Sequence, residues 1–289
     1  VCSSDLLLFT TCILIAVGIF SLYSQNLSIK PRVEEGVLDL SNWEFERDGI
    51  VELRGQWGFT EGITNELMHI ETFKQFASVP GDMPIAHNKG AGTYHLKVIL
   101  PSDAKRSLAV DVEGVRMSNT LIVNGQKIHS EGQPANSRED YKARNIPYTS
   151  QFTTDGHELN ISFQVANFDY YKTGIHLPIY LGTSDQISKR QMIQIIFGAS
   201  GVMIAIITAF IFLVVYFSFN QEKGGLILGS YFLVWAVLMA TTNQKLFLQI
   251  FPESPFITLV KIRDFAMYFA IPLLIYYATK LFPQTKKGW

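Results

Sequence analysis

The chain has 289 residues and is close to neutral, with 24 Lys and Arg against 25 Asp and Glu, and 48% of its residues are hydrophobic. It shows no basic stripe, so we expect no nucleic-acid partner. Both cysteines, Cys2 and Cys12, precede the charge-rich part of the chain, which therefore has no disulfide and must fold by apolar burial.

The N-terminal end divides into two stretches of different origin. Residues 1–6 resemble the translation of a sequencing adapter, so we expect no structural role for them. Residues 7–23 form an uncharged run, long enough either for the core of a signal peptide or for a membrane anchor. Either alternative delivers the following block across the membrane.

Residues 27–184 contain short apolar alternations separated by turn residues, as in Val51-Glu52-Leu53 and Leu108-Ala109-Val110-Asp111-Val112. Alternation with a period of two at this spacing predicts an antiparallel sandwich. Asn124-Gly125 between two such runs predicts a hairpin with a type I′ turn, because both residues tolerate positive φ angles.

Three apolar stretches follow, and we predict a membrane-spanning helix in each of residues 192–219, 224–244 and 257–282. The short polar turn 220–223 makes the first two an antiparallel pair. The third has Lys261, Arg263 and Asp264 near its start, as either an intramembrane switch or, more simply, headgroup anchors. Counting positive charges does not determine the orientation, so the leading apolar segment is what favours an outer location for residues 27–184.

Several motifs occur in the order found in one family of sensors. They are GVLDLSNW (36–43), GQWGF (55–59), VPG (79–81), GTYHL (92–96), VNG (123–125), VANF (165–168) and GIHLPIYLG (174–182). In these the chain resembles bacterial seven-transmembrane receptors with diverse intracellular signalling modules. The resemblance implies an all-β jelly-roll sandwich of the galactose-binding-like type outside the membrane, seven helices, and a cytoplasmic cyclase, diguanylate cyclase or histidine kinase. With three helices present, we expect this chain to be a piece of a longer protein.

The VPG and VNG elements also resemble the non-catalytic sugar-binding domain of family 2 glycoside hydrolases, which implies a carbohydrate-type ligand. That implication is an analogy between folds, and function depends on sites. The sequence has no hydrolase, phosphate-binding or metalloprotease motif, so we expect no enzyme activity in this chain. Asp39, Glu44 and Glu46 lie near Trp43 and could act as a glycosidase carboxylate pair, but solvated strand edges are the simpler interpretation.

Two turn-rich stretches, 138–144 and 167–176, combine aromatic rings with directional hydrogen-bonding groups, as sugar sites do. The predicted ligand-binding residues are Arg138, Tyr141, Asn167, Tyr170, Tyr171 and His176. The alternative is that these aromatic side chains pack the loop against the sandwich or the bilayer surface, and that Asn167 caps a turn.

Other candidate residues have simpler interpretations. We expect Trp43 and Trp57 to pack in the core rather than form a binding platform, and His95 and His129 to lie on separate strands. We therefore predict no metal and no cofactor.

The small residues at 201, 205, 225 and 229 predict close helix packing, within the chain or in a homodimer.

The resulting hypothesis is a multi-pass protein of the bacterial inner membrane that carries the sensory portion of a signalling receptor. Its head would bind a small molecule or glycan, change its docking on the helices through the short tether 181–191, and pass the signal inward. Two alternatives stay open. One is a membrane-anchored carbohydrate-capture module, and the other is a piece of a transporter or channel with an outer lid.

Overall fold

The computed structural model describes residues 31–64, 73–101, 106–218, 223–242 and 244–281. Residues 7–23, residues 27–30 of the predicted sandwich and residues 220–222 of the expected turn lie outside the described residues. The chain divides after residue 31 into two units. All that follows concerns the second unit, in which we call residues 32–183 the head.

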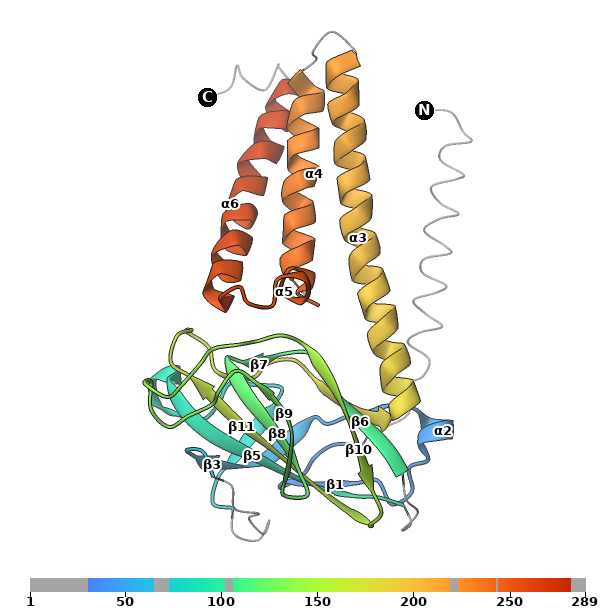
Figure 1. Ribbon diagram of the computed structural model, residues 1–289, viewed down its shortest axis with the longest axis vertical. Helices are drawn as coiled ribbons and strands as arrows, with labels where there is room; N and C mark the ends of the chain where they lie inside the picture. Colours follow the sequence, from blue (N-terminus) through green and yellow to red (C-terminus); the bar gives the residue numbers. More distant parts are fainter. Residues whose placement is uncertain (1–30, 65–72, 102–105, 219–222, 243, 282–289) are drawn as a thin grey trace. The chain divides into compact units, whose positions relative to one another are not determined.

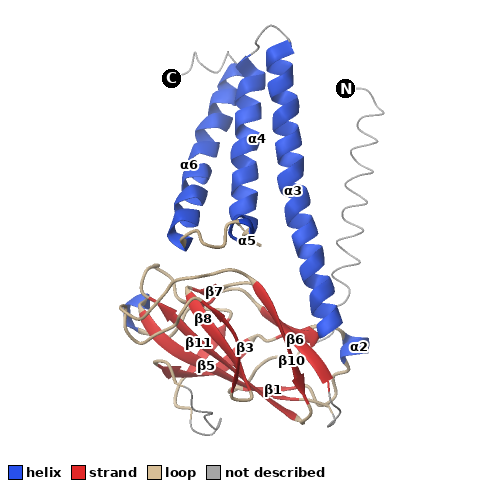
Figure 2. Ribbon diagram, viewed as in Figure 1, coloured by secondary structure: helices blue, strands red, loops and turns tan. Residues whose placement is uncertain are grey.

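The head is built from short strands with few helical turns between them (Figure 2). The strands are β1 (Val37–Asp39), β2 (Val51–Glu52), β3 (Gly55–Glu61), β4 (Phe76–Val79), β5 (Gly90–Ile99), β6 (Arg106–Val112), β7 (Val115–Arg116), β8 (Ser118–Val123), β9 (Gln126–Glu131), β10 (Tyr148–Thr154), β11 (Glu158–Asn167), β12 (Gly174–Ile175) and β13 (Ile179–Thr183). One helical turn, α2 (Phe45–Asp48), and a 3₁₀ turn (Ala86–Asn88) interrupt them.

These strands form two main sheets. The larger has the order β4-β3-β5-β11-β8-β9 with β1 added beside β5, and the smaller has the order β10-β6-β13-β2. A two-stranded sheet joins β12 to β7. Among the named strands only β1 and β5 pair in parallel. The predicted antiparallel β-rich head is therefore confirmed.

One apolar core lies between the two main sheets. The larger sheet contributes Trp57, Tyr94 and Phe163, and the smaller contributes Val110 and Leu181, all of them with no measurable exposure. The Trp57 and Phe163 ring centroids are 6.0 Å apart, and Trp57 Nε1 donates a hydrogen bond to the Leu53 carbonyl at 3.1 Å. Two sheets that share a core in this way are compatible with a sandwich.

The predicted hairpin is confirmed at β8–β9. Val123 pairs with Gln126, and the two turn residues have positive φ angles, 49° at Asn124 and 80° at Gly125. Both angles fit a type I′ turn. The Asn124 side chain also accepts a hydrogen bond from the backbone N–H of Asn160 at 2.8 Å, which ties the turn to β11.

The first long helix, α3 (Ser184–Ser218), begins earlier than predicted. The polar stretch before residue 192, expected to be a tether, is its first turns, and it follows β13 without an intervening residue. The reason is a capping box at the start of the helix. The Thr183 hydroxyl accepts a hydrogen bond from the backbone N–H of Gln186 at 3.3 Å, and the side-chain oxygen of Gln186 accepts one from the backbone N–H of Thr183 at 3.2 Å. Ile187 is fully buried, which anchors this polar turn to the head.

Three further helices follow, α4 (Lys223–Thr241), the short α5 (Leu246–Ile250), which the sequence did not predict, and α6 (Phe256–Leu281). Helix α4 packs against both α3 and α6 (Figure 1). Within the described residues, α3 and α4 are long and apolar enough to cross a membrane. Helix α6 corresponds to the third predicted span, but it is not among the helices that are long and apolar enough to cross a membrane.

The small residues of α4 pack within the chain. A side chain at Gly225 would place Cβ 2.9 Å from the Phe212 carbonyl oxygen of α3, and one at Gly229 would place it 3.2 Å from the Ala209 oxygen. These contacts account for the small residues by close packing of α3 on α4.

One expectation about the acidic cluster near Trp43 needs correction. Glu44 and Glu46 do not lie on strand edges, because Glu44 occupies the N-cap position of α2 and Glu46 lies within the helix. The Glu44 carboxylate is 3.3 Å from Arg47, and both side chains are largely exposed. Trp43 precedes α2, packs partly buried against the core, and donates from Nε1 to the Gly49 carbonyl at 3.0 Å. Trp57 has the predicted core position.

Candidate functional site at the junction of head and helices

The two stretches predicted to bind a ligand meet in space. Arg138 donates to the Phe168 carbonyl oxygen at 2.9 Å and to Asp169 Oδ1 at 2.8 Å. The Tyr141 and Phe168 rings make an edge contact with centroids 5.2 Å apart. Residues some 30 positions apart in sequence are thus joined by one ion pair and one aromatic contact.

Asn167 is fully buried and its side-chain amide organises the loop that follows β11. The amide nitrogen donates to the carbonyl oxygens of Tyr170 and Lys172, at 2.8 and 3.1 Å. The amide oxygen accepts from the backbone N–H groups of Tyr170 and Asp169, at 2.9 and 3.2 Å. This is the turn-capping arrangement that the sequence offered as the alternative to ligand contact.

The other predicted residues lie around the same loop. The Tyr170 and Tyr171 ring centroids are 4.5 Å apart, and Tyr171 is 67% exposed. The Arg116 guanidinium lies 4.9 Å from the centroid of the Tyr170 ring. His176 Nε2 is 3.1 Å from both the Thr173 carbonyl oxygen and Asp82 Oδ1. Burial, followed by the charge of Arg116, lowers the pKa of His176.

A second apolar cluster connects these loops to the helices. Met117, Tyr141 and Ala166 from the head are buried together with Leu248, Phe256, Leu259 and Val260 from α5 and α6, and Phe168 and Tyr170 pack against them. We call this contact the junction. The aromatic side chains of the predicted ligand loops therefore pack against helices, and within this structure only Tyr171 among the predicted tyrosines is largely exposed.

Lys245, in the connection between α4 and α5, is bonded into the head at the junction. Its backbone is left-handed, with φ 47°, and its ammonium group donates to the backbone and side-chain oxygens of Asn145 at 2.7 and 2.6 Å. Phe256 lies 5.3 Å away as a cation–π partner. Burial lowers the pKa of Lys245 to about 7, with smaller contributions from Arg116 and Arg263, while Glu131 acts in the opposite direction.

A second polar contact ties α3 to the head. Arg190 donates from Nε to Asp111 Oδ2 at 3.0 Å and from Nη2 to Glu113 Oε1 at 2.6 Å, and its guanidinium lies 3.8 Å from the centroid of the Tyr180 ring. Gln194 also donates to Glu113 and accepts from Gln244 at 2.9 Å. Burial and then the Glu113 carboxylate raise the pKa of Asp111 to about 6, and Arg190 opposes them.

The ionisable residues at the start of α6 also face this region. Arg263 donates to Asp264 Oδ1 at 3.0 and 2.8 Å, and the Arg263 side chain is close enough to hydrogen-bond Tyr170. Lys261 is exposed. The pair Arg263–Asp264 therefore lies against a loop of the head, a position that apolar periodicity alone does not reveal.

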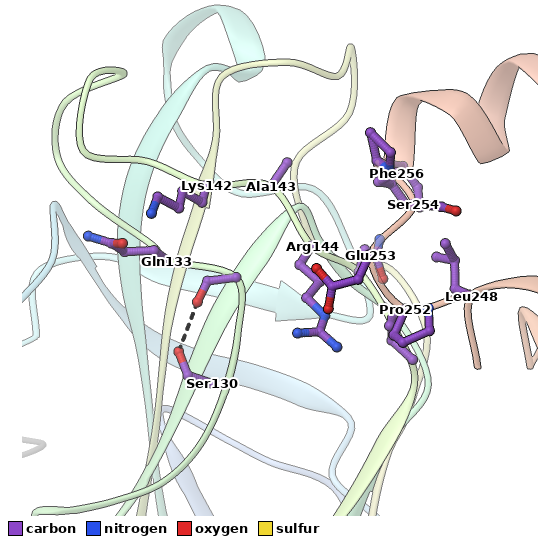
Figure 3. Close-up of a pocket in the computed structure, with 14 residues that line it drawn as sticks. Ser130, Gln133, Lys142, Ala143, Arg144, Leu248, Pro252, Glu253, Ser254 and Phe256 are labelled. Atoms are coloured by element: carbon purple, nitrogen blue, oxygen red, sulfur yellow. Dashed lines mark hydrogen bonds between the residues drawn. The ribbon is translucent and has the colours of Figure 1, made fainter. Parts of the chain in front are cut away.

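A cavity of about 370 Å³ opens between the head and the helices (Figure 3). The head contributes side chains from 130–133 and 142–146, and the other wall comes from 248–256. Arg144 and Glu253 both point into it from opposite walls (Figure 3). Among the described residues, no group of three His, Cys, Asp or Glu could hold a metal ion. Sequence reasoning missed this cavity because its two walls are about a hundred residues apart and neither contains a motif.

No protein-family model matches the chain, and no curated protein matches it. Solved structures with local similarity include a GH2 beta-galacturonidase from Eisenbergiella tayi bound to glycerol, at 18% identity, 46% coverage of this chain, 24% of that chain and a TM-score of 0.32. A beta-glucuronidase of an uncultured Clostridium species has 18% identity, coverages of 46% and 28% and a TM-score of 0.35. A glycosyl hydrolase family 2 member from Bacteroides cellulosilyticus has 16% identity, coverages of 46% and 20% and a TM-score of 0.36. The chain thus spans about a quarter of the length of these enzymes.

Proposed function

We propose that this chain is the sensory portion of a bacterial membrane signalling receptor, with a galactose-binding-like jelly-roll head outside the inner membrane. The family resemblance of the head motifs supports the fold and the function. The two long apolar helices α3 and α4 support the membrane location. The head would bind a small molecule or a glycan and transmit binding to the helices.

The observation that carries the proposal is the direct passage of strand β13 into helix α3. Strand β13 ends at Thr183 and helix α3 begins at Ser184, so no linker lies between them. The capping box fixes the angle between the strand and the helix. The Arg190 and Lys245 contacts then attach the head to two further points of the helical part. Three attachments let a change in the head alter helix packing, which is what a sensor that signals through its helices requires.

Membrane topology is the first test. In a variant with Cys2 and Cys12 replaced by serine, Lys127→Cys places a thiol on the exposed strand β9 of the head, and Lys223→Cys places one at the far end of α3–α4. An impermeant maleimide added to intact spheroplasts should label the head thiol and spare Lys223→Cys until the cells are opened. Labelling with the opposite preference would refute an outer sensor.

Coupling is the second test. Four residues, Gly-Ser-Gly-Ser, inserted between Thr183 and Ser184 should abolish ligand-dependent output of the full-length receptor. The same insertion at Gly156, in the turn between β10 and β11, is the matched control and should leave the output intact. Unchanged signalling with the first insertion would contradict coupling through α3. Ligand binding without any output from the protein that carries no insertion would favour a head that captures carbohydrate without signalling.

A further inference from the structure

Two cationic side chains and one carboxylate line the junction cavity. Its head wall provides Lys142 and Arg144 and its helical wall provides Glu253. Arg144 is partly neutralised, since its Nε lies 3.1 Å from Glu131 Oε2, and Glu131 is also 3.0 Å from His129. Lys142 has no carboxylate within ion-pair distance in the described ranges.

A further ionisable amine, that of Lys245, stands directly behind the cavity wall. Asn145 and Phe256 both line the cavity, and both are the partners of the Lys245 ammonium group, at 2.7 Å and 5.3 Å. Among the residues that the structure describes, no carboxylate is within ion-pair distance of that ammonium. A cation held among neutral partners is costly, and an anion nearby would offset part of the cost.

The remaining lining is suited to a hydroxylated molecule. Ser130, Gln133 and Ser254 supply hydroxyl and amide groups, while Ile146, Leu248 and Phe256 supply an apolar surface. A volume of about 370 Å³ lies in the range of small-molecule sites. Figure 3 shows the Lys142 side chain directed toward Gln133 and the Arg144 side chain directed toward Glu253, so a carboxylate or phosphate would meet Lys142 beside Gln133 while the rest of the molecule extends into the cavity.

We propose that the junction cavity binds a monosaccharide-sized anion bearing a carboxylate or a phosphate, with Lys142 as its charge partner. Because its two walls belong to the head and to the helices, the complete site exists only when the two are docked. Binding therefore stabilises the docked state. The claim that the receptor senses this anion rests on the proposed function. Binding of the anion can be measured on the chain alone.

The same chemistry could come from a free solute or from a lipid headgroup, and the experiment separates them. The chain is placed in phosphatidylcholine nanodiscs and titrated calorimetrically with gluconate, with glucitol as the uncharged six-carbon control, and with inorganic phosphate. A second preparation uses phosphatidylglycerol nanodiscs, with thermal melting as the readout. The variants are Lys142→Gln, Glu253→Gln, and Lys127→Gln as an exposed lysine on β9 outside the cavity.

We expect gluconate or phosphate to bind and glucitol not to bind. Lys142→Gln should weaken binding up to about fivefold, Glu253→Gln should tighten it about two- to threefold, and Lys127→Gln should leave it unchanged. If the anion is a headgroup, phosphatidylglycerol raises the melting temperature and Lys142→Gln removes the rise. The proposal is overturned if glucitol binds as tightly as gluconate. It is also overturned if Lys142→Gln weakens the effect of every anion no more than Lys127→Gln does. Either of those results leaves the topology and insertion tests of the proposed function unaffected.

Discussion

Substitution of Arg190 by methionine tests how strongly α3 is held to the head. The change keeps most of the aliphatic side chain but removes the charge, so Asp111, which is only 3% exposed, loses its cation. Breaking a buried ion pair from one side costs about 3–5 kcal/mol. The Arg190 side chain is 27% exposed, so we expect solvent screening to reduce the loss to about 2 kcal/mol.

The measurement is thermal unfolding of the chain in nanodiscs, followed by the emission of its tryptophans, of which Trp57 lies in the core of the head. For a domain of this size a loss of about 2 kcal/mol corresponds to a decrease in Tm of about 4–8 °C. Adding Asp111→Asn should recover part of the decrease, because the unpaired buried carboxylate is then gone. Arg54→Met, which breaks a more exposed pair with Glu52 at 2.9 Å, should lower Tm by less than about 2 °C. Equal effects of the two arginine substitutions, or no recovery by Asp111→Asn, would refute this reasoning.

Two further predictions concern Lys245 and the glycines. The pKa of Lys245 is lowered from 10.5 to about 7 in the folded chain, so between these values the unfolded state binds more protons and the free energy of unfolding should rise with pH. Lys245→Met should flatten the increase in Tm between pH 7 and pH 10; an unaltered slope would assign that increase to other groups. Gly174→Ala should cost about 3 kcal/mol or more, because Gly174 has φ +113° and the new Cβ would lie 2.6 Å from the Gly81 oxygen and the Met83 nitrogen. Gly156→Ala, whose Cβ would meet nothing closer than 3.9 Å, should stay within about 0.5 kcal/mol in denaturant titrations.

The strands and their hairpin could be predicted because their signals are local. Alternation in residues 108–112 and the Asn124-Gly125 turn depend on neighbours in sequence, and both are present in β6 and β8–β9. The start of α3 was missed because hydropathy marks where the apolar run begins, whereas the capping box of Thr183 and Gln186 marks where the helix begins.

The candidate site was predictable only in part. Composition singled out two stretches that meet at Arg138 and Asp169, but their contact with α5 and α6 is a long-range property. Lys245 stands in a short polar connection that looks like any helix flank. Its importance comes from Asn145, one hundred residues earlier, and no local pattern joins the two.

The passage of β13 into α3 without a spare residue also makes the head sensitive to helix phase. An α-helix advances about 1.5 Å and turns about 100° per residue. One residue added within α3 on the C-terminal side of Arg190 would therefore rotate the head about the helix axis relative to the remainder of α3. Lys245 could then no longer reach Asn145. An insertion of a full helical turn would keep the orientation of the head about the helix axis, whereas an insertion of a single residue would not. The two insertions should consequently differ in their effects.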